Sequence, residues 1–164
     1  MEKMDGSHHP LFCTGELADS LAELDLYPVA AILVEYFSKR KDARLELRTK
    51  SDNVDKLLGI DHKQNTTVAF SISPQEHVYK YEPGTASLEQ QLVARRKCQD
   101  AGYPVALKIE PLIIIQGWQR NYQETIEAVT SRLIVSAIDH VSIGCLRWSE
   151  GLAAVPMCDL MACP

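Results

Sequence analysis

The chain has 164 residues, a formal net charge of -5 and 46% hydrophobic residues, a composition that suits one globular domain. The negative charge gives no sign of a nucleic-acid-binding surface, and no apolar run approaches the roughly 20 residues of a membrane span. Residues 1–10 lack the apolar core of a secretory signal. We therefore expect a cytoplasmic protein with no membrane partner, beginning with a disordered leader over residues 1–10.

The cysteines give no indication of a disulfide scaffold or a structural zinc site. Their number is odd, and no two of them form a Cys-x-x-Cys pair. The histidines are scattered as well. We therefore expect no metal site from these residues, and interpret most of them as reduced thiols and surface imidazoles. The cysteines are Cys13, Cys98, Cys145, Cys158 and Cys163.

The pattern along the chain predicts strands that alternate with helices. Residues 11–14 form a short apolar strand that ends at Gly15, where glycine permits an unusual turn and a close approach of ligand to backbone. Residues 17–39 have a helical pattern in two segments, the second of which begins at Pro28. The expected buried face of that second helix consists of Val29, Ile32, Leu33, Tyr36 and Phe37.

Residues 43–58 are the stretch around which the rest of the chain is organised. Their first half alternates between apolar and charged residues, which predicts a strand that stops at Thr49-Lys50. Their second half predicts a short helix whose apolar residues include Val54 and Leu57. Lys50 would then leave a strand opposite a helix N-terminus, where α/β proteins place ligand contacts. A solvated lysine at a strand end is the alternative interpretation.

The second half of the chain repeats this organisation. Residues 66–72 are β-branched and apolar and predict a buried strand that Pro74 ends. Ser87 is expected to cap a helix that runs to about Ala101, with Gly102 after its end. The other predicted elements are a short amphipathic piece over 75–82, a strand over 104–109 with its exit at Glu110-Pro111, a helix over 122–133 with Ile126 and Val129 inside, and a strand over 140–146.

Each connection is long enough for a right-handed βαβ unit, so the sheet should be parallel. The predicted fold class is α/β, either an incomplete parallel (β/α) barrel of about five βα units or a small open parallel sheet. A complete eight-fold barrel needs roughly 250 residues. We assign the barrel domain to residues 11–148 and an irregular tail to residues 149–164, which have little charge and no clear period.

Polar residues gather at the predicted strand exits. Ligands of parallel β/α proteins bind at the carboxyl ends of the strands, which meet at one rim. These residues suit a zwitterionic ligand, with Lys50 for a carboxylate, Glu16 for an ammonium group and Ser71 for a ribose or carboxylate oxygen. The exits carry Cys13, Thr14, Gly15, Glu16, Thr49, Lys50, Ser71, Ser73, Glu110, Gly144 and Cys145.

Five segments closely resemble the spore photoproduct lyase family of radical-SAM proteins. Their order and spacing match that family across about residues 13–152. The longest of them is the most specific, because it combines a turn, a cap and a helix. The segments are TGELADSLAELD, RLELRTKSDNVDKLL, FSISPQE, EPGTASLEQQLVARRKCQDAGYPV and EPLIIIQGW.

This resemblance implies a partial TIM-type barrel, of the (β/α)6 kind, and a DNA-repair lyase reaction. Enzymes of the family use a [4Fe-4S] cluster to cleave S-adenosylmethionine (SAM) reductively, and the radical that forms reverses the 5-thyminyl-5,6-dihydrothymine lesion in DNA. SAM is therefore the implied cofactor and DNA the implied partner. The resemblance places SAM contacts at Gly15, Glu16, Lys50 and Ser71, with Glu110 beside the adenosine.

Cys13 fits two interpretations. In the repair enzymes of the family, a cysteine at this position returns a hydrogen atom to the product radical, a role that suits the weak S–H bond of a thiol. Many relatives outside spore formers lack this cysteine, and the rest of the sequence is closer to theirs. The alternative is an ordinary buried thiol.

One departure from the family pattern is decisive for the chemistry. The family's Cys-x3-Cys-x2-Cys motif is absent from the sequence, and three thiolates are needed to hold three irons of the cluster. We therefore expect a truncated copy or one part of a split enzyme, inactive by itself. The alternatives are a non-catalytic module that binds SAM or a nucleotide, and a gene fragment without function. The strand over 11–14 would also be an exposed sheet edge, which predicts marginal stability and self-association.

Overall fold

The structure is a computed structural model that describes residues 9–16 and 18–145. Five strands form one sheet in the order β1-β2-β3-β4-β5, and all neighbouring strands are parallel. This confirms the predicted α/β fold with an incomplete parallel barrel. Most of the predicted leader and all of the predicted tail lie outside the described residues. The strands are β1 (Leu11–Thr14), β2 (Arg44–Thr49), β3 (Thr66–Ser71), β4 (Val105–Leu112) and β5 (Ile138–Cys145).

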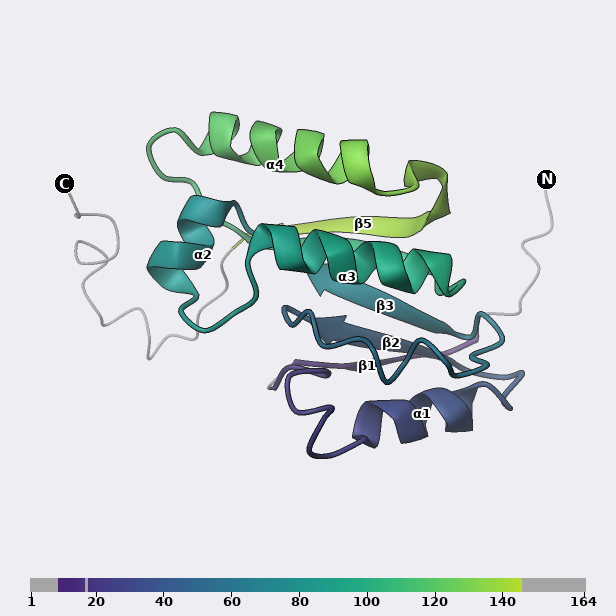
Figure 1. Cartoon of the computed structure of the whole chain (residues 1–164). Helices are drawn as coiled ribbons and strands as arrows, with labels where there is room; N and C mark the ends of the chain where they lie inside the picture. Colours follow the sequence, from purple (N-terminus) through teal and green to yellow (C-terminus); the bar gives the residue numbers. More distant parts are fainter. Residues whose placement is uncertain (1–8, 17, 146–164) are drawn as a thin grey trace, which may run out of the picture.

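Four α-helices accompany the sheet in the described part of the chain. Figure 1 shows α1, α3 and α4 running alongside the strands, and α2 beyond the end at which the strands finish. Val34 of α1, Leu92 of α3 and Val129 of α4 are all buried in one apolar cluster with strand residues. The helices are α1 (Val29–Phe37), α2 (Gln75–Tyr81), α3 (Leu88–Asp100) and α4 (Trp118–Arg132).

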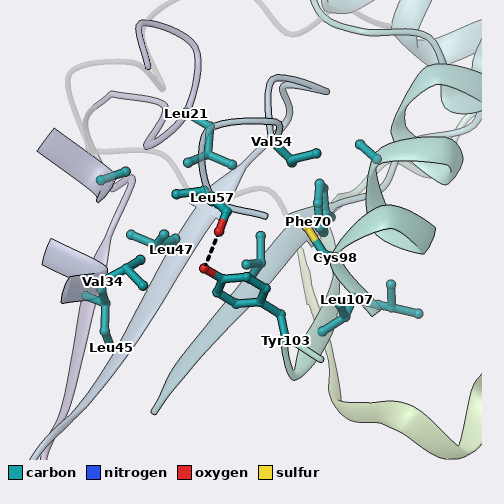
Figure 2. Close-up of a cluster of buried hydrophobic side chains, with 14 of the residues drawn as sticks. Leu21, Val34, Leu45, Leu47, Val54, Leu57, Phe70, Cys98, Tyr103 and Leu107 are labelled. Atoms are coloured by element: carbon teal, nitrogen blue, oxygen red, sulfur yellow. Dashed lines mark hydrogen bonds between the residues drawn. The ribbon is translucent and has the colours of Figure 1, made fainter. Parts of the chain in front are cut away.

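The core lies between these helices and the sheet. Leu45 and Leu47 lie two residues apart on β2, so both side chains point to the same face of the sheet, into the core that also contains Phe70 of β3 (Figure 2). The phenol group of Tyr103 donates a hydrogen bond to the carbonyl oxygen of Leu57 at 2.9 Å within this apolar surrounding (Figure 2). The bond ties the loop after β2 to the start of β4.

The opposite face of the sheet, here called the inner face, is polar. Glu46 of β2 pairs with Cys13 of β1 on one side and with Thr67 of β3 on the other. Ser71 of β3 pairs with Lys108 of β4 in the same way. Because strand residues alternate between the two faces, the residues that do not enter the core line up across the inner face. They include Cys13, Glu46, Arg48, Thr67, Ala69, Ser71, Ala106, Lys108 and Ser142.

The helical interpretation of residues 17–39 is correct only for its second segment. Residues 18–27 form turns, in which the Asp19 carboxylate accepts hydrogen bonds from the backbone N–H groups of Leu21 at 2.8 Å and Ala22 at 3.0 Å. An aspartate that binds the backbone in this way competes with helix formation. Leu21 and Leu24 are nevertheless buried in the core.

The predicted buried face of α1 is wrong at three of its five residues, whereas Phe37 is buried as predicted and Leu33 is partly buried. Val29, Ile32 and Tyr36 are exposed, whereas the helix buries Ala30, Val34 and Phe37. The sequence of α1 is apolar on two neighbouring stripes with the same helical spacing, so periodicity alone cannot choose between them. Packing against β2 makes the choice.

No helix forms over residues 51–58, contrary to prediction. The side chain of Thr49 accepts a hydrogen bond from the N–H of Ser51 at 2.9 Å, and the Ser51 hydroxyl accepts one from the N–H of Asn53 at 3.1 Å. These side chains take backbone donors that a helix would use, and the segment folds as turns. Val54 and Leu57 still reach the core.

Two boundaries in the second half also differ from prediction. Strand β4 continues through Pro111 to Leu112, and α4 begins at Trp118, four residues before the predicted start. Helix α4 buries Val129 as expected, but Ile126 is exposed. The capping residue of α3 is confirmed: Ser87 Oγ accepts from the N–H of Gln90 at 3.3 Å, and the Gln90 side chain accepts from the N–H of Ser87 at 2.9 Å.

Candidate functional site

An open pocket of about 370 Å³ lies where β2, β3 and β4 end. A volume of this size suits a small-molecule ligand. All five residues predicted as ligand contacts line it, namely Gly15, Glu16, Lys50, Ser71 and Glu110. Five further residues line the pocket, namely Ala18, Asp19, Arg48, Thr49 and Lys108. Thr49 was noted from the sequence only as a strand-exit residue, the other four were not indicated, and Cys13 does not line the pocket.

At Gly15 the backbone itself lines the pocket, because glycine has no side chain. Its φ is +90°, a region that favours glycine, and a Cβ at this position would lie 2.5 Å from the carbonyl oxygen of Arg48. The same carbonyl oxygen accepts a hydrogen bond from the N–H of Ser20 at 3.1 Å. The loop after β1 is therefore held tightly against the end of β2, and only a glycine fits there.

Asp19 fastens this loop to the strand exit and was missed from the sequence. One carboxylate oxygen accepts from the hydroxyl of Thr49 at 2.7 Å, and the other accepts from the backbone N–H of Lys50 at 2.6 Å. The available signal was an aspartate just before Leu21 and Ala22, which is typical of a turn whose side chain binds backbone N–H groups.

Lys50 lines the pocket, and its ammonium group already has a carboxylate partner. Its ammonium group forms an ion pair with Glu82, and the same Glu82 oxygen accepts a hydrogen bond from the hydroxyl of Ser73 at 2.9 Å. Glu82 directly follows α2, so α2 contributes to the site from beyond the sheet. The role predicted for Lys50, attraction of a ligand carboxylate, stays a prediction, and in this structure its ammonium group is paired with Glu82.

A buried carboxylate organises the inner face beside the pocket. The side chain of Glu46 lies 2.8 Å from Arg48 Nε, 3.2 Å from Lys108 Nζ and 3.4 Å from His140 Nε2. Burial acts to raise the pKa of Glu46, but the hydrogen bond from Arg48 and the nearby Lys108 outweigh it, and the pKa is lowered. Arg48 also pairs with Glu16, so it joins this charge cluster to the pocket.

Cys13 lies on the inner face next to Glu46 in the strand register, and its side chain is exposed at the edge of the sheet. The interpretation of Cys13 as a buried thiol is therefore wrong. Partial desolvation and the charge of Glu46 raise the pKa of the thiol, against the opposing effects of Arg48 and Lys108. Cys13 therefore carries its proton at neutral pH.

The described residues do not fit an iron–sulfur cluster. Three thiolates are required, and the three described cysteines are spread over the fold: Cys13 is on β1, Cys145 is on β5 at the other edge of the sheet, and Cys98 is a buried residue of α3. Within residues 9–16 and 18–145, no group of three His, Cys, Asp or Glu side chains could hold a metal ion. No helix in the same part of the chain is long and apolar enough to cross a membrane.

The family model described as spore photoproduct lyase matches residues 18–149. The chain belongs to the spore photoproduct lyase family. Among curated relatives, the spore photoproduct lyase of Bacillus subtilis is 32% identical over 100 residues, which cover 61% of this chain and 29% of the relative. The corresponding values for Clostridium acetobutylicum are 28%, 61% and 30%. The resemblance found in the sequence is thus confirmed.

Solved structures of the family share this fold. A double mutant of spore photoproduct lyase with bound AdoMet and dinucleoside spore photoproduct superimposes with a TM-score of 0.79 at 26% identity, over 87% of this chain and 43% of that chain. Another, complexed with dinucleoside spore photoproduct, gives 0.74 at 27% identity, over 81% and 39%. The chain therefore spans less than half the length of the spore photoproduct lyases that it matches.

Replacing Glu46 with Gln tests the charge cluster. Because the folded state lowers the pKa of Glu46, its ionised form stabilises the protein at pH values above the unfolded-state pKa of about 4.3, and this contribution is lost as the pH falls through the lower folded-state pKa. We expect Glu46→Gln to lower the free energy of unfolding by about 2 kcal/mol at pH 7 and by much less near pH 3. Urea unfolding across this pH range measures the difference.

The matched control is Glu35→Gln, which changes an exposed glutamate on α1. We expect this variant to follow the parent chain at every pH. A Glu46→Gln variant whose stability also follows the parent chain throughout would contradict the assigned role of the buried carboxylate.

Proposed function

We propose that this chain is the SAM-binding part of a spore photoproduct lyase-like radical-SAM protein, and that by itself it does not reverse the DNA lesion. The observation that carries the proposal is the meeting of an amine, carboxylates and a hydroxyl around the bare backbone of Gly15, at the exits of parallel strands. A family structure with bound AdoMet has the same fold and supports this choice of ligand.

The pocket residues have the functional groups that a zwitterionic nucleoside needs. Lys50 would attract the methionyl carboxylate and Glu16 the ammonium group, while Ser71 offers a hydroxyl and Glu110 an acceptor beside the adenosine. Bound SAM would supply the carbon–sulfur bond that radical-SAM chemistry cleaves. The contribution of the chain is to orient this ligand at the edge of the inner face.

We assign the substrate side to the inner face and Cys13 to hydrogen-atom donation. The pKa of Cys13 is raised, so the S–H bond that this role requires is present at neutral pH. The proposed substrate is the thymine-dimer lesion of DNA, because family structures contain a dinucleoside spore photoproduct. Arg48 pairs with Glu16 at the pocket and with Glu46 on the inner face, and would connect the two ligand sites.

A non-catalytic module that binds SAM or a nucleotide is the second candidate. Its support is the scattered arrangement of Cys13, Cys98 and Cys145, which offers no three-thiolate site for a cluster within the part of the chain that the structure describes. The two candidates share the pocket and differ in whether the chain, alone or with another polypeptide, holds iron.

SAM binding is tested by calorimetry on the full chain and on Lys50→Met. We expect the parent chain to bind SAM and Lys50→Met to bind at least about tenfold more weakly, a loss of about 1.4 kcal/mol, because the methyl group cannot attract the carboxylate. Lys97→Met is the control, since Lys97 is an exposed residue of α3 that pairs with Asp55. Equal affinities for all three proteins would refute the assignment of the pocket.

The absence of activity is tested by measuring iron and sulfide after anaerobic reconstitution. We expect far less than one [4Fe-4S] cluster per chain and no reductive cleavage of SAM, because the three thiolate ligands are missing. A stoichiometric cluster with its absorbance band would show that the remaining cysteines do hold iron, and the chain would then be a candidate enzyme in its own right.

We also propose that copies of the chain associate through the sheet edges. Leu11 and Phe12 of β1 are exposed, as are Val141 and Ile143 of β5, and unpaired edge strands invite pairing with another chain. We expect the mass from light scattering to rise with concentration, and Ile143→Lys to suppress the rise. Ile114→Lys, which changes an exposed loop residue, should not suppress it. A concentration-independent monomer would refute the proposal.

A further inference from the structure

Two polar side chains of α3 form hydrogen bonds with backbone carbonyl groups where β2 and β3 end. Gln91 Nε2 donates a hydrogen bond to the carbonyl oxygen of Lys50 at 2.9 Å. Arg95 Nη2 donates to the carbonyl oxygen of Ser71 at 3.2 Å and to Gln91 Oε1 at 2.8 Å. Lys50 and Ser71 both line the pocket, so one linked pair of side chains holds the backbone at two of its walls. We call this pair the α3 brace.

The brace is fully buried and incompletely satisfied. Arg95 is 0% exposed and Gln91 is 2% exposed. The Nε and Nη1 atoms of Arg95 have no hydrogen-bond partner among the described residues, and its guanidinium lies over the ring of Phe70, 5.0 Å from the centroid. Desolvation lowers the pKa of Arg95 to about 9, so it remains a cation at neutral pH.

This arrangement is poor for stability alone. A buried cation without a carboxylate partner costs folding free energy, and apolar side chains of similar size often replace buried charges without loss. The four-residue spacing of Gln91 and Arg95 puts them on one face of α3, where the neighbouring buried residues Leu92 and Cys98 are apolar. A cost of this kind is typical of a group retained for a ligand site rather than for packing.

We propose that Gln91 and Arg95 are positioning residues of the pocket, which fix the carbonyl groups of Lys50 and Ser71, and that the unpaired positive charge of Arg95 favours the anionic group of the ligand. The proposal deepens the proposed function, since the ligand is then a zwitterion whose carboxylate approaches Lys50. Neither residue touches the ligand. They act by holding the backbone and through the electrostatic field of a buried charge, which is strong where water is excluded.

The test compares Arg95→Met with Arg96→Met. Arg96 is the next residue of α3, but it is exposed and pairs with Asp100 at 2.9 Å. We expect Arg95→Met to keep or raise the melting temperature and yet to weaken SAM binding at least about tenfold, whereas Arg96→Met changes neither. Arg95→Lys, which keeps a charged donor, should recover part of the affinity. Loss of affinity without loss of stability separates a positioning role from a structural one.

Amide hydrogen exchange provides a readout that does not depend on SAM. We expect faster exchange in residues 49–52 and 71–74 of Arg95→Met than in the parent chain, with no change in α4. If Arg95→Met does not fold, Gln91→Leu is measured instead. This variant keeps the bond from Arg95 to the Ser71 carbonyl and removes the bonds of the Gln91 amide to the carbonyl oxygens of Lys50 and Ala86 and to Arg95.

Each outcome decides the proposal. Unchanged SAM affinity together with unchanged exchange at the two strand exits, in whichever variant folds, overturns it. If the parent chain binds no SAM, the proposed function fails, and the exchange rates alone decide: faster exchange at the exits supports the brace, and unchanged exchange refutes it.

Discussion

Parallel pairing of all five strands is the constraint on which the rest of the molecule depends. Parallel neighbours require a crossover after each strand, so every strand finishes at the same edge of the sheet. Residues far apart in the sequence, such as Glu16, Lys50 and Glu110, are thereby brought around one pocket. The helices of the crossovers pack on one face of the sheet. The other face carries polar side chains, which form hydrogen bonds and ion pairs with one another. The cluster around Glu46 is the result.

The pocket is held in shape chiefly by side chains that bind backbone groups. Lys50 illustrates this, because its N–H is bound by Asp19 from the loop after β1, and its carbonyl oxygen is bound by Gln91 from α3. Both backbone groups of one residue are thus fixed by segments that lie on either side of it in sequence. Regular secondary structure ends at Thr49, so these contacts replace the sheet hydrogen bonds that would otherwise keep the exit in place.

Local patterns in the sequence predicted the strands, their exits and the capped start of α3, because alternation, proline and capping residues act over a few positions. They could not choose between the two apolar stripes of α1, since that choice depends on packing against β2. They also missed Asp19, Glu82 and Arg95, whose roles arise from contacts with residues far away in the chain. The turns over 51–58 were missed because hydroxyl groups competed for backbone donors that helical spacing assigns to a helix.

The two edge strands of the sheet have a geometric consequence. The two edges of the sheet are different strands, β1 and β5, which run in the same direction. If β5 of one copy paired with β1 of the next, the contact would join two different parts of the molecule and would be heterologous. Such contacts form a closed ring only when the rotation between copies divides a full turn, and otherwise they propagate as an open filament. Whether association of this chain would be finite therefore depends on the rotation that pairing of β1 with β5 imposes between neighbouring copies.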